Sequence, residues 1–164
     1  MGGLISNPKR VGSSLRKRIS GPNALPITQL VAMGERASER VQESFNDFLR
    51  QRISCLEDLL PRLMQNNCED AEWRNFFTIV RDIRGSSALA QSKGANTFCK
   101  SFEVLLQERD TADPRMPEAI RSHISALSLI ANGRAGDEKT QEMLSSHLTR
   151  AVDALPVMAP RSSV

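Results

Sequence analysis

Apolar residues recur every three or four positions along most of this chain, and that spacing places them on one face of an α-helix. The longest such series extends from Ile27 to Leu63. Pro26 precedes the series, Thr28 is a candidate N-cap, and Pro61 should kink or end the last turn. We therefore expect a long helix from Pro26 to about Gln65, with a break near Gly34 or Glu43 as the alternative because about 38 residues is long for one globular helix.

Shorter series with the same spacing follow, and turn-forming residues separate them. They predict helices over about 71–91 and 92–109, a helix that ends at Asn132–Gly133, and a last helix that reaches Leu155. Helices joined by short turns lie antiparallel and bury their apolar faces against one another. The sequence therefore predicts an all-α protein: an antiparallel up-and-down four-helix bundle with an additional C-terminal helix.

Positive charge is concentrated at one end of the chain. The first 21 residues contain no acidic residue and five basic ones: Lys9, Arg10, Arg16, Lys17 and Arg18. Since the whole chain has a net charge of +3, the remainder carries −2. Gly, Ser and Pro without periodicity predict a disordered basic arm over residues 1–26. The helical bundle is predicted over residues 27–156, and a disordered tail over residues 157–164.

The sequence lacks the motifs of disulfide frameworks, metal sites, membrane spans and the common enzyme classes. Cys55, Cys68 and Cys99 form no Cys-x-x-Cys pair and no metal-binding pattern with the two histidines, which favours a reducing compartment. The sequence contains no run of 18 apolar residues, which a helix would need to span a bilayer. We therefore expect a cytoplasmic protein. No nucleophile elbow, phosphate-binding loop or zinc-protease motif occurs. We expect neither enzymatic activity nor a cofactor or metal.

The stretch from Phe76 to Glu103 contains the pattern with the clearest chemical meaning. Phe76, Val80, Ile83, Ser87 and Ala90 share one face of the predicted helix, and the face opposite carries Phe77, Arg81, Arg84, Gly85 and Ala88. A glycine inside a helix is less favourable than alanine by about 1 kcal/mol. Its presence beside two cations and a phenyl ring predicts that another molecule approaches the backbone closely at this face.

These residues resemble the motif of histidine-containing phosphotransfer domains, H-x-L-[KR]-G-S-[SA]. Ile83, Arg84, Gly85, Ser86 and Ser87 match it without gaps, and Cys99, Phe102 and Glu103 match the C-x-x-L-E that follows. The surrounding F-x-I-V-R-D-I-R-G is most similar to stand-alone proteins of this family from alphaproteobacteria. Two positions depart from the pattern. The phosphorylated histidine is replaced by Arg81, and a glycine that could end the helix is replaced by Gln91.

The first departure changes the expected chemistry. A phosphoryl relay needs a neutral imidazole nitrogen as nucleophile, whereas a guanidinium stays protonated and only donates hydrogen bonds. The resemblance therefore implies the four-helix fold and a non-catalytic protein-binding module, with no small-molecule substrate. Its partner would be a response-regulator receiver domain or a histidine kinase. The expected binding face is Phe77, Arg81, Arg84, Gly85 and Ala88, supported by Ile83, Ser86, Ser87 and Cys99.

Two alternatives remain open at this stage. A helical adaptor could act through its basic arm, with Lys9, Arg10, Arg16, Lys17 and Arg18 contacting nucleic acid, a membrane or an acidic protein. A phosphotransfer protein could also use an unusual acceptor histidine, for which His123 is the candidate. His123 lies in an H-[IV]-x-A-L run that is typical of a structural position.

Overall fold

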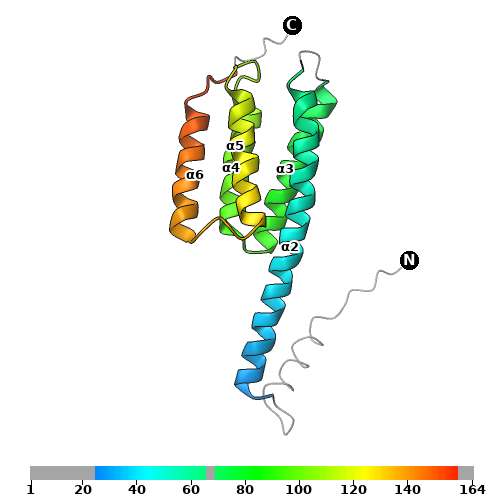
Figure 1. The fold of residues 1–164 in the computed structure, drawn as a ribbon, viewed down its shortest axis with the longest axis vertical. Helices are drawn as coiled ribbons and strands as arrows, with labels where there is room; N and C mark the ends of the chain where they lie inside the picture. Colours follow the sequence, from blue (N-terminus) through cyan, green and yellow to red (C-terminus); the bar gives the residue numbers. More distant parts are fainter. Residues whose placement is uncertain (1–24, 66–68, 159–164) are drawn as a thin grey trace, which may run out of the picture. The chain divides into compact units, whose positions relative to one another are not determined.

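The computed structural model describes residues 25–65 and 69–158, and these form five helices. The helices are α2 (Ile27–Leu63), α3 (Asp70–Leu89), α4 (Lys93–Glu108), α5 (Met116–Ala131) and α6 (Glu138–Asp153) (Figure 1). The described residues contain no β-strand beyond an isolated bridge between Arg109 and Val157. The prediction of an all-α protein is confirmed. Most of the predicted arm and tail, residues 1–24 and 159–164, lies outside the described part of the chain.

The chain divides into two compact units, residues 1–40 and residues 41–164, and helix α2 contains the boundary. In the first unit, the described residues after Pro26 are all helical. Three apolar side chains of this helical segment are exposed: Ile27 by 80%, Val31 by 53% and Met33 by 50%. Among the described residues, the apolar series that predicted the long helix therefore forms no core along this first segment.

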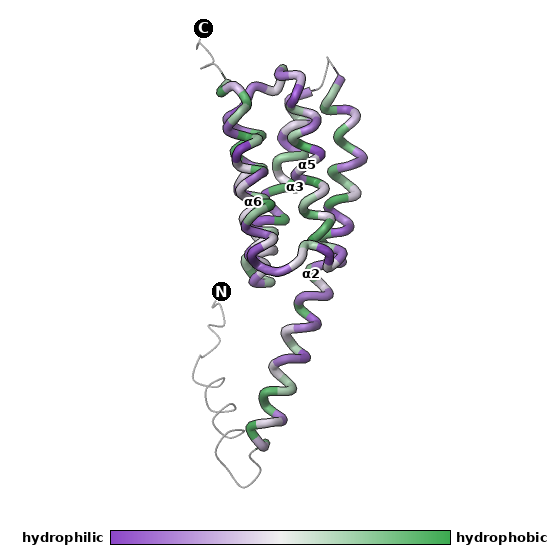
Figure 2. The backbone as a smooth tube through the Cα atoms, turned by 60° about the vertical axis from the view of Figure 1, so that its left-hand side comes forward, coloured by the Kyte–Doolittle hydropathy of each residue, from purple (hydrophilic) through white to green (hydrophobic). Residues whose placement is uncertain are grey.

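In the second unit, the helices pack around one hydrophobic core, and we call this group of helices the bundle. Consecutive helices run in opposite directions (Figure 1), and apolar and polar residues alternate along each of them (Figure 2). Helix α4 packs on α3, α5 and α6. Fully buried core side chains come from four helices: Leu49, Leu56, Phe76, Val80, Ile83, Phe98, Phe102, Leu105, Ile120 and Leu127.

Helix boundaries follow the predictions to within a residue or two, with two corrections. Helix α2 begins at Ile27, directly after Pro26, so Thr28 lies inside the first turn and is not the N-cap. Helix α3 begins at Asp70, one residue before its predicted start. Pro61 lies in the last turn of α2, where the helix ends as predicted.

The stop signal at Asn132–Gly133 ends α5 as expected. Asn132 is the C-cap residue, and Gly133 takes the left-handed conformation with a φ of 64°. The amide of Gly133 donates to the carbonyl of Ile130 (3.0 Å), and the amide of Arg134 donates to that of Leu129 (2.7 Å). This pair of hydrogen bonds is the Schellman motif, which favours glycine because its central residue has a positive φ.

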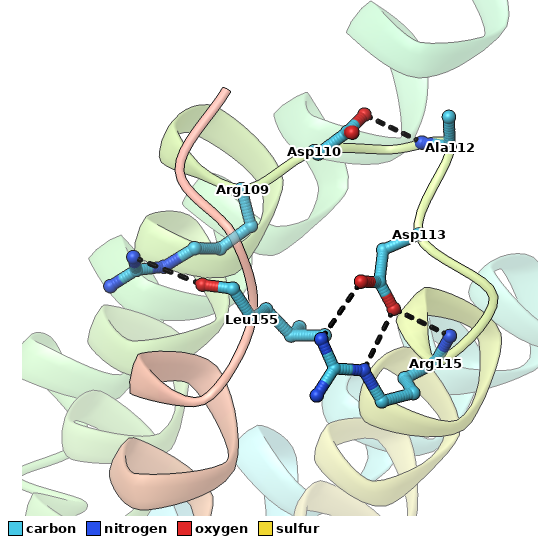
Figure 3. A network of polar contacts seen from close by, with 6 residues as sticks. All are labelled: Arg109, Asp110, Ala112, Asp113, Arg115 and Leu155. Carbon is cyan, nitrogen blue, oxygen red and sulfur yellow. Dashed lines mark hydrogen bonds and ion pairs between the residues drawn. The ribbon is translucent and has the colours of Figure 1, made fainter. Parts of the chain in front are cut away.

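After α6 the chain is attached to the end of α4. The backbone of residues 156–158 pairs with that of residues 108–110 through N–H···O bonds of 3.0 and 2.8 Å. The guanidinium of Arg109 also donates to the carbonyl of Leu155 (3.4 Å; Figure 3) and to the carboxylate of Asp153 (3.2 Å). The predicted tail was expected to begin at residue 157, but its first two residues are held by these contacts.

The loop between α4 and α5 is closed by its own aspartates (Figure 3). Asp110 accepts a hydrogen bond from the amide of Ala112 (2.9 Å). Asp113 accepts from the amide and the guanidinium of Arg115 (2.8 and 2.9 Å). These bonds stabilise the ionised carboxylate and lower the pKa of Asp113 to about 2. Helix α5 starts one residue after this turn.

Candidate functional site

Helix α3 has one face in the core and one face toward solvent, as its sequence predicted. Phe76, Val80, Ile83 and Ser87 are fully buried. Phe77 is half-buried on the opposite side, and Arg81, Gly85 and Ala88 are exposed. We call the side that carries Phe77, Arg81, Gly85 and Ala88 the α3 face.

The predicted site has two cations, Arg81 and Arg84, and they differ in whether a described carboxylate neutralises them. Among the described residues Arg81 has no acidic partner, and its contact is with the ring of Phe77, one turn earlier on the same helix. The guanidinium carbon lies 5.9 Å from the ring centroid, within the range of a cation–π interaction. The phenyl ring holds the arginine side chain along the helix surface, and the charge stays accessible from outside.

Arg84 is placed differently from the prediction that grouped it with Arg81. Its guanidinium forms an ion pair with the carboxylate of Glu103 on α4. The Glu103 side chain is only 14% exposed and the Arg84 side chain 40% exposed, so the pair lies against the bundle. A carboxylate with so little access to water needs a positive partner. Arg84 therefore links α3 to α4, and the α3 face presents the charge of Arg81.

Gly85 has open space in front of its backbone. A Cβ atom built at this position would meet no atom within 4 Å, so no neighbour in the described chain requires a glycine here. Ala88, one turn later, is also exposed. The two residues leave a shallow, uncharged stretch of helix surface beside Arg81. An external molecule could approach the backbone at this point.

Leu89 extends the α3 face and was missed by the sequence analysis. It is the last residue of α3, and its side chain is 86% exposed. The signal was present: Phe77, Arg81, Gly85 and Leu89 follow one another at steps of four. The α3 face thus has an apolar residue at each end and a single cation between them. Arginine and large apolar side chains are common in binding hot spots.

The four residues expected to support the motif serve the bundle. Ile83 and Ser87 are buried, and the Ser87 hydroxyl donates to the carbonyl of Arg84 (2.7 Å). Ser86 is half-buried, and its carbonyl accepts the amide of Ala90. Cys99 is fully buried, and burial, with a smaller contribution from Glu103, raises the pKa of its thiol to about 12. The thiol is therefore a packing group.

Gln91 ends α3, although its replacement of a glycine made a longer helix conceivable. Helix α3 stops at Leu89, and Gln91 has a φ of 56°, the only positive value of a non-glycine residue in the described chain. The amide of Gln91 donates to the carbonyl of Ala88 (3.3 Å), and that of Ser92 to Ser87 (2.9 Å). This is the same Schellman motif as at the end of α5, with glutamine where α5 has glycine.

His123 lies in the core of the bundle. Its Nδ1 is 2.8 Å from the carbonyl of Ala119 and its Nε2 is 3.1 Å from the hydroxyl of Ser101. A carbonyl only accepts, so Nδ1 carries the proton and Nε2 accepts from the hydroxyl. The ring also stacks on Phe102 with centroids 4.8 Å apart. Burial lowers the pKa of His123 to about 4. With both nitrogens occupied and no exposed surface, this histidine is inaccessible to a phosphoryl donor.

Two other kinds of site are absent from the described part of the chain. Residues 25–65 and 69–158 contain no cluster of His, Cys, Asp or Glu that could hold a metal ion. No helix among them is long and apolar enough to cross a membrane. The basic residues of the predicted arm, from Lys9 to Arg18, lie outside the described part of the chain.

Comparisons with known proteins add no family to this description. No protein-family model, no curated protein and no solved structure matches the chain.

Proposed function

We propose that this chain is a phosphotransfer-like helical bundle that binds a partner of two-component signalling and transfers no phosphate. The partner would be a response-regulator receiver domain or a histidine kinase. The resemblance of residues 81–87 and 99–103 to the histidine-containing phosphotransfer motif leads to this function. In such a domain, α2, α3, α4 and α5 would form the antiparallel four-helix bundle, and α6 would be the additional C-terminal helix.

The observation that carries the proposal is the state of Arg81. It occupies the motif position of the phosphorylated histidine, it is exposed, and no described acidic group neutralises it. A permanent cation at this position can pair with carboxylates of a partner but cannot accept a phosphoryl group. The ring of Phe77 orients the guanidinium before binding, which lowers the entropy lost when a partner docks.

The rest of the α3 face fits a protein partner. Gly85 and Ala88 let another backbone approach closely, and the exposed Leu89 offers apolar area at the end of the helix. Because Arg84 is paired with Glu103, Arg81 is the cation of the α3 face that has no acidic partner among the described residues. Charge complementarity at such a face contributes mainly to specificity and to the rate of association.

Titration calorimetry against purified receiver domains and kinase domains from the same organism tests the function. We expect Arg81→Glu to weaken binding at least ten-fold, about 1.4 kcal/mol, because it places a like charge opposite the partner's carboxylates. Lys139→Glu is the matched control. It makes the same change of charge on α6, which packs on α4 and α5, and it should leave affinity unchanged.

Two results would contradict the proposal. One is binding that Arg81→Glu and Phe77→Ala leave intact, because the α3 face would then not be the contact. The other is transfer of labelled phosphate from a phosphorylated receiver domain to this chain, measured on the wild-type protein and on His123→Ala.

A further inference from the structure

Helix α4 carries an exposed cation beside the α3 face. Lys100 is exposed, and its ammonium has no ion-pair partner among the described residues. The part of the chain outside the described residues contains no Asp and no Glu. No acidic side chain from those segments can therefore neutralise Lys100, and the same holds for Arg81.

Two contacts fix the position of Lys100 relative to α3. Glu103 on α4 pairs with Arg84 on α3. Asn96 on α4 lines the same pocket as Ala88 on α3. In the sequence, Lys100 follows Asn96 by four residues and precedes Glu103 by three, so all three lie on one side of α4. Lys100 is therefore level with the stretch of α3 from Arg84 to Ala88.

Arg81 and Lys100 lie on opposite sides of the ion pair that joins the two helices. Arg81 comes one turn before Arg84 on α3. Lys100 comes one turn before Glu103 on α4, and because the helices are antiparallel (Figure 1), the two turns extend in opposite directions. Three residues of each helix add up to about 9 Å along the axes, and packed helices lie about 8–10 Å apart. The two residues therefore leave their helices about 13 Å apart.

An open pocket of about 560 Å³ lies next to Lys100, between the end of α3 and the start of α4. Ala88, Gln91 and Asn96 are among its lining residues. The side-chain amides of Gln91 and Asn96 have no hydrogen-bond partner among the described residues. Such amides can donate to a carboxylate or to a peptide carbonyl. The pocket therefore supplies neutral donors beside the cation.

We propose that Lys100 binds the same partner as Arg81, so that the protein recognises a cluster of carboxylates through one cation on each helix. The inference rests on the proposed function, because its partner is the receiver or kinase domain named there. One cation attracts any exposed acid. Two cations held at a fixed separation favour a surface that presents acids at two matching places, which adds specificity.

A polyanion such as nucleic acid fits the two helices less well. Helix α3 contains three basic and three acidic residues, and α4 contains two of each, so neither helix has a net charge. Nucleic acid binds where basic residues are clustered over a wide surface. Positive charge without a described partner is local here, at Arg81 and Lys100, and a compact group of carboxylates matches it better than an extended row of phosphates.

Titration calorimetry of the full chain with the receiver or kinase domain that binds the wild type tests the proposal. Lys100→Glu should weaken binding at least ten-fold, because it reverses a charge at the contact. Lys100→Gln removes the charge without placing an acid beside Glu103, and it should weaken binding about three-fold. Lys139→Glu, the same change on α6, should leave affinity unchanged. Circular dichroism checks that the variants remain folded.

A charge exchange identifies the contact directly. Replacing one acidic residue of the partner's contact surface by lysine should weaken binding to the wild type and restore binding to Lys100→Glu. Full affinity of Lys100→Gln would overturn the inference, because the loss in Lys100→Glu would then come from the acid added beside Glu103.

The remaining outcomes separate this inference from the proposed function. If Arg81→Glu weakened binding and Lys100→Glu behaved like Lys139→Glu, Lys100 would lie outside the contact, and only the inference would be overturned. If no receiver or kinase domain bound the wild type, both would be overturned. If the chain bound double-stranded DNA in place of these domains and lost that binding in Lys100→Glu, the partner would be a polyanion.

Discussion

Replacing Gln91 by glycine should stabilise this protein, because the helix end at this residue has a backbone conformation that glycine prefers. Gln91 has a φ of 56°, and its amide and that of Ser92 close a Schellman motif. The left-handed conformation costs an L-residue about 1–2 kcal/mol. Glycine avoids that cost but loses more backbone entropy on folding, about 0.5–1 kcal/mol. The expected net gain for Gln91→Gly is about 1 kcal/mol.

The bundle supplies its own reference for this prediction. At the end of α5 the same motif has Gly133 in the equivalent position, with a φ of 64°. Gly133→Gln should therefore destabilise the protein by a similar amount, about 1 kcal/mol. The double variant, Gln91→Gly with Gly133→Gln, should have a stability close to that of the wild type, because the two sites are independent.

Urea unfolding followed by circular dichroism measures these changes, and thermal unfolding should show a shift of about 2–4 °C for each single variant. Gln91→Ala separates the backbone effect from loss of the glutamine side chain, because alanine has the same difficulty with a positive φ. If Gln91→Gly gave no gain, or if Gln91→Ala gave an equal gain, the assignment of strain to this backbone position would be wrong.

Three further predictions concern the bundle and the α3 face. Because the pKa of His123 is lowered from 6.5 to about 4, the unfolded chain binds more protons between these values, and stability should fall by about 2 kcal/mol from pH 7 to pH 5 in urea unfolding. Gly85→Ala should raise stability by about 1 kcal/mol, since its Cβ would meet nothing, while weakening partner binding in calorimetry. Glu103→Gln should lower stability by about 1 kcal/mol, because it removes the charge that pairs with Arg84. The released Arg84 could then also pair with an acidic partner, so that Arg81→Glu would weaken binding less in this background.

Controls distinguish these effects from general damage. His123→Gln should flatten the dependence of stability on pH between 5 and 7. For the helix glycine, Gly34→Ala is the comparison, since a Cβ there also meets no atom and Gly34 lies outside the α3 face. Equal losses of partner binding for Gly34→Ala and Gly85→Ala would argue against close approach at Gly85. Unchanged stability of Glu103→Gln would show that its ion pair contributes nothing measurable.

The sequence by itself determined the helices and the inward face of α3. Apolar spacing identified every described helix, because a helix in a bundle must bury one side. The pattern of apolar and polar residues along the chain is enough to show which side that is. Phe76, Val80 and Ile83 were placed in the core for this reason, and they are buried. Gly133 was recognised as a helix end because glycine at that point has a local backbone cause.

Only the tertiary structure decided which of these residues remain available to another molecule. Arg81 and Arg84 are equivalent in sequence, yet Arg84 is paired because Glu103 comes near it on α4, and that contact joins residues 19 positions apart. The apolar series of α2 has the same spacing on both sides of residue 40, but among the described residues it forms a core only in the second unit. Local pattern fixes what a helix must bury, whereas long-range packing decides whether a neighbour is there to bury it.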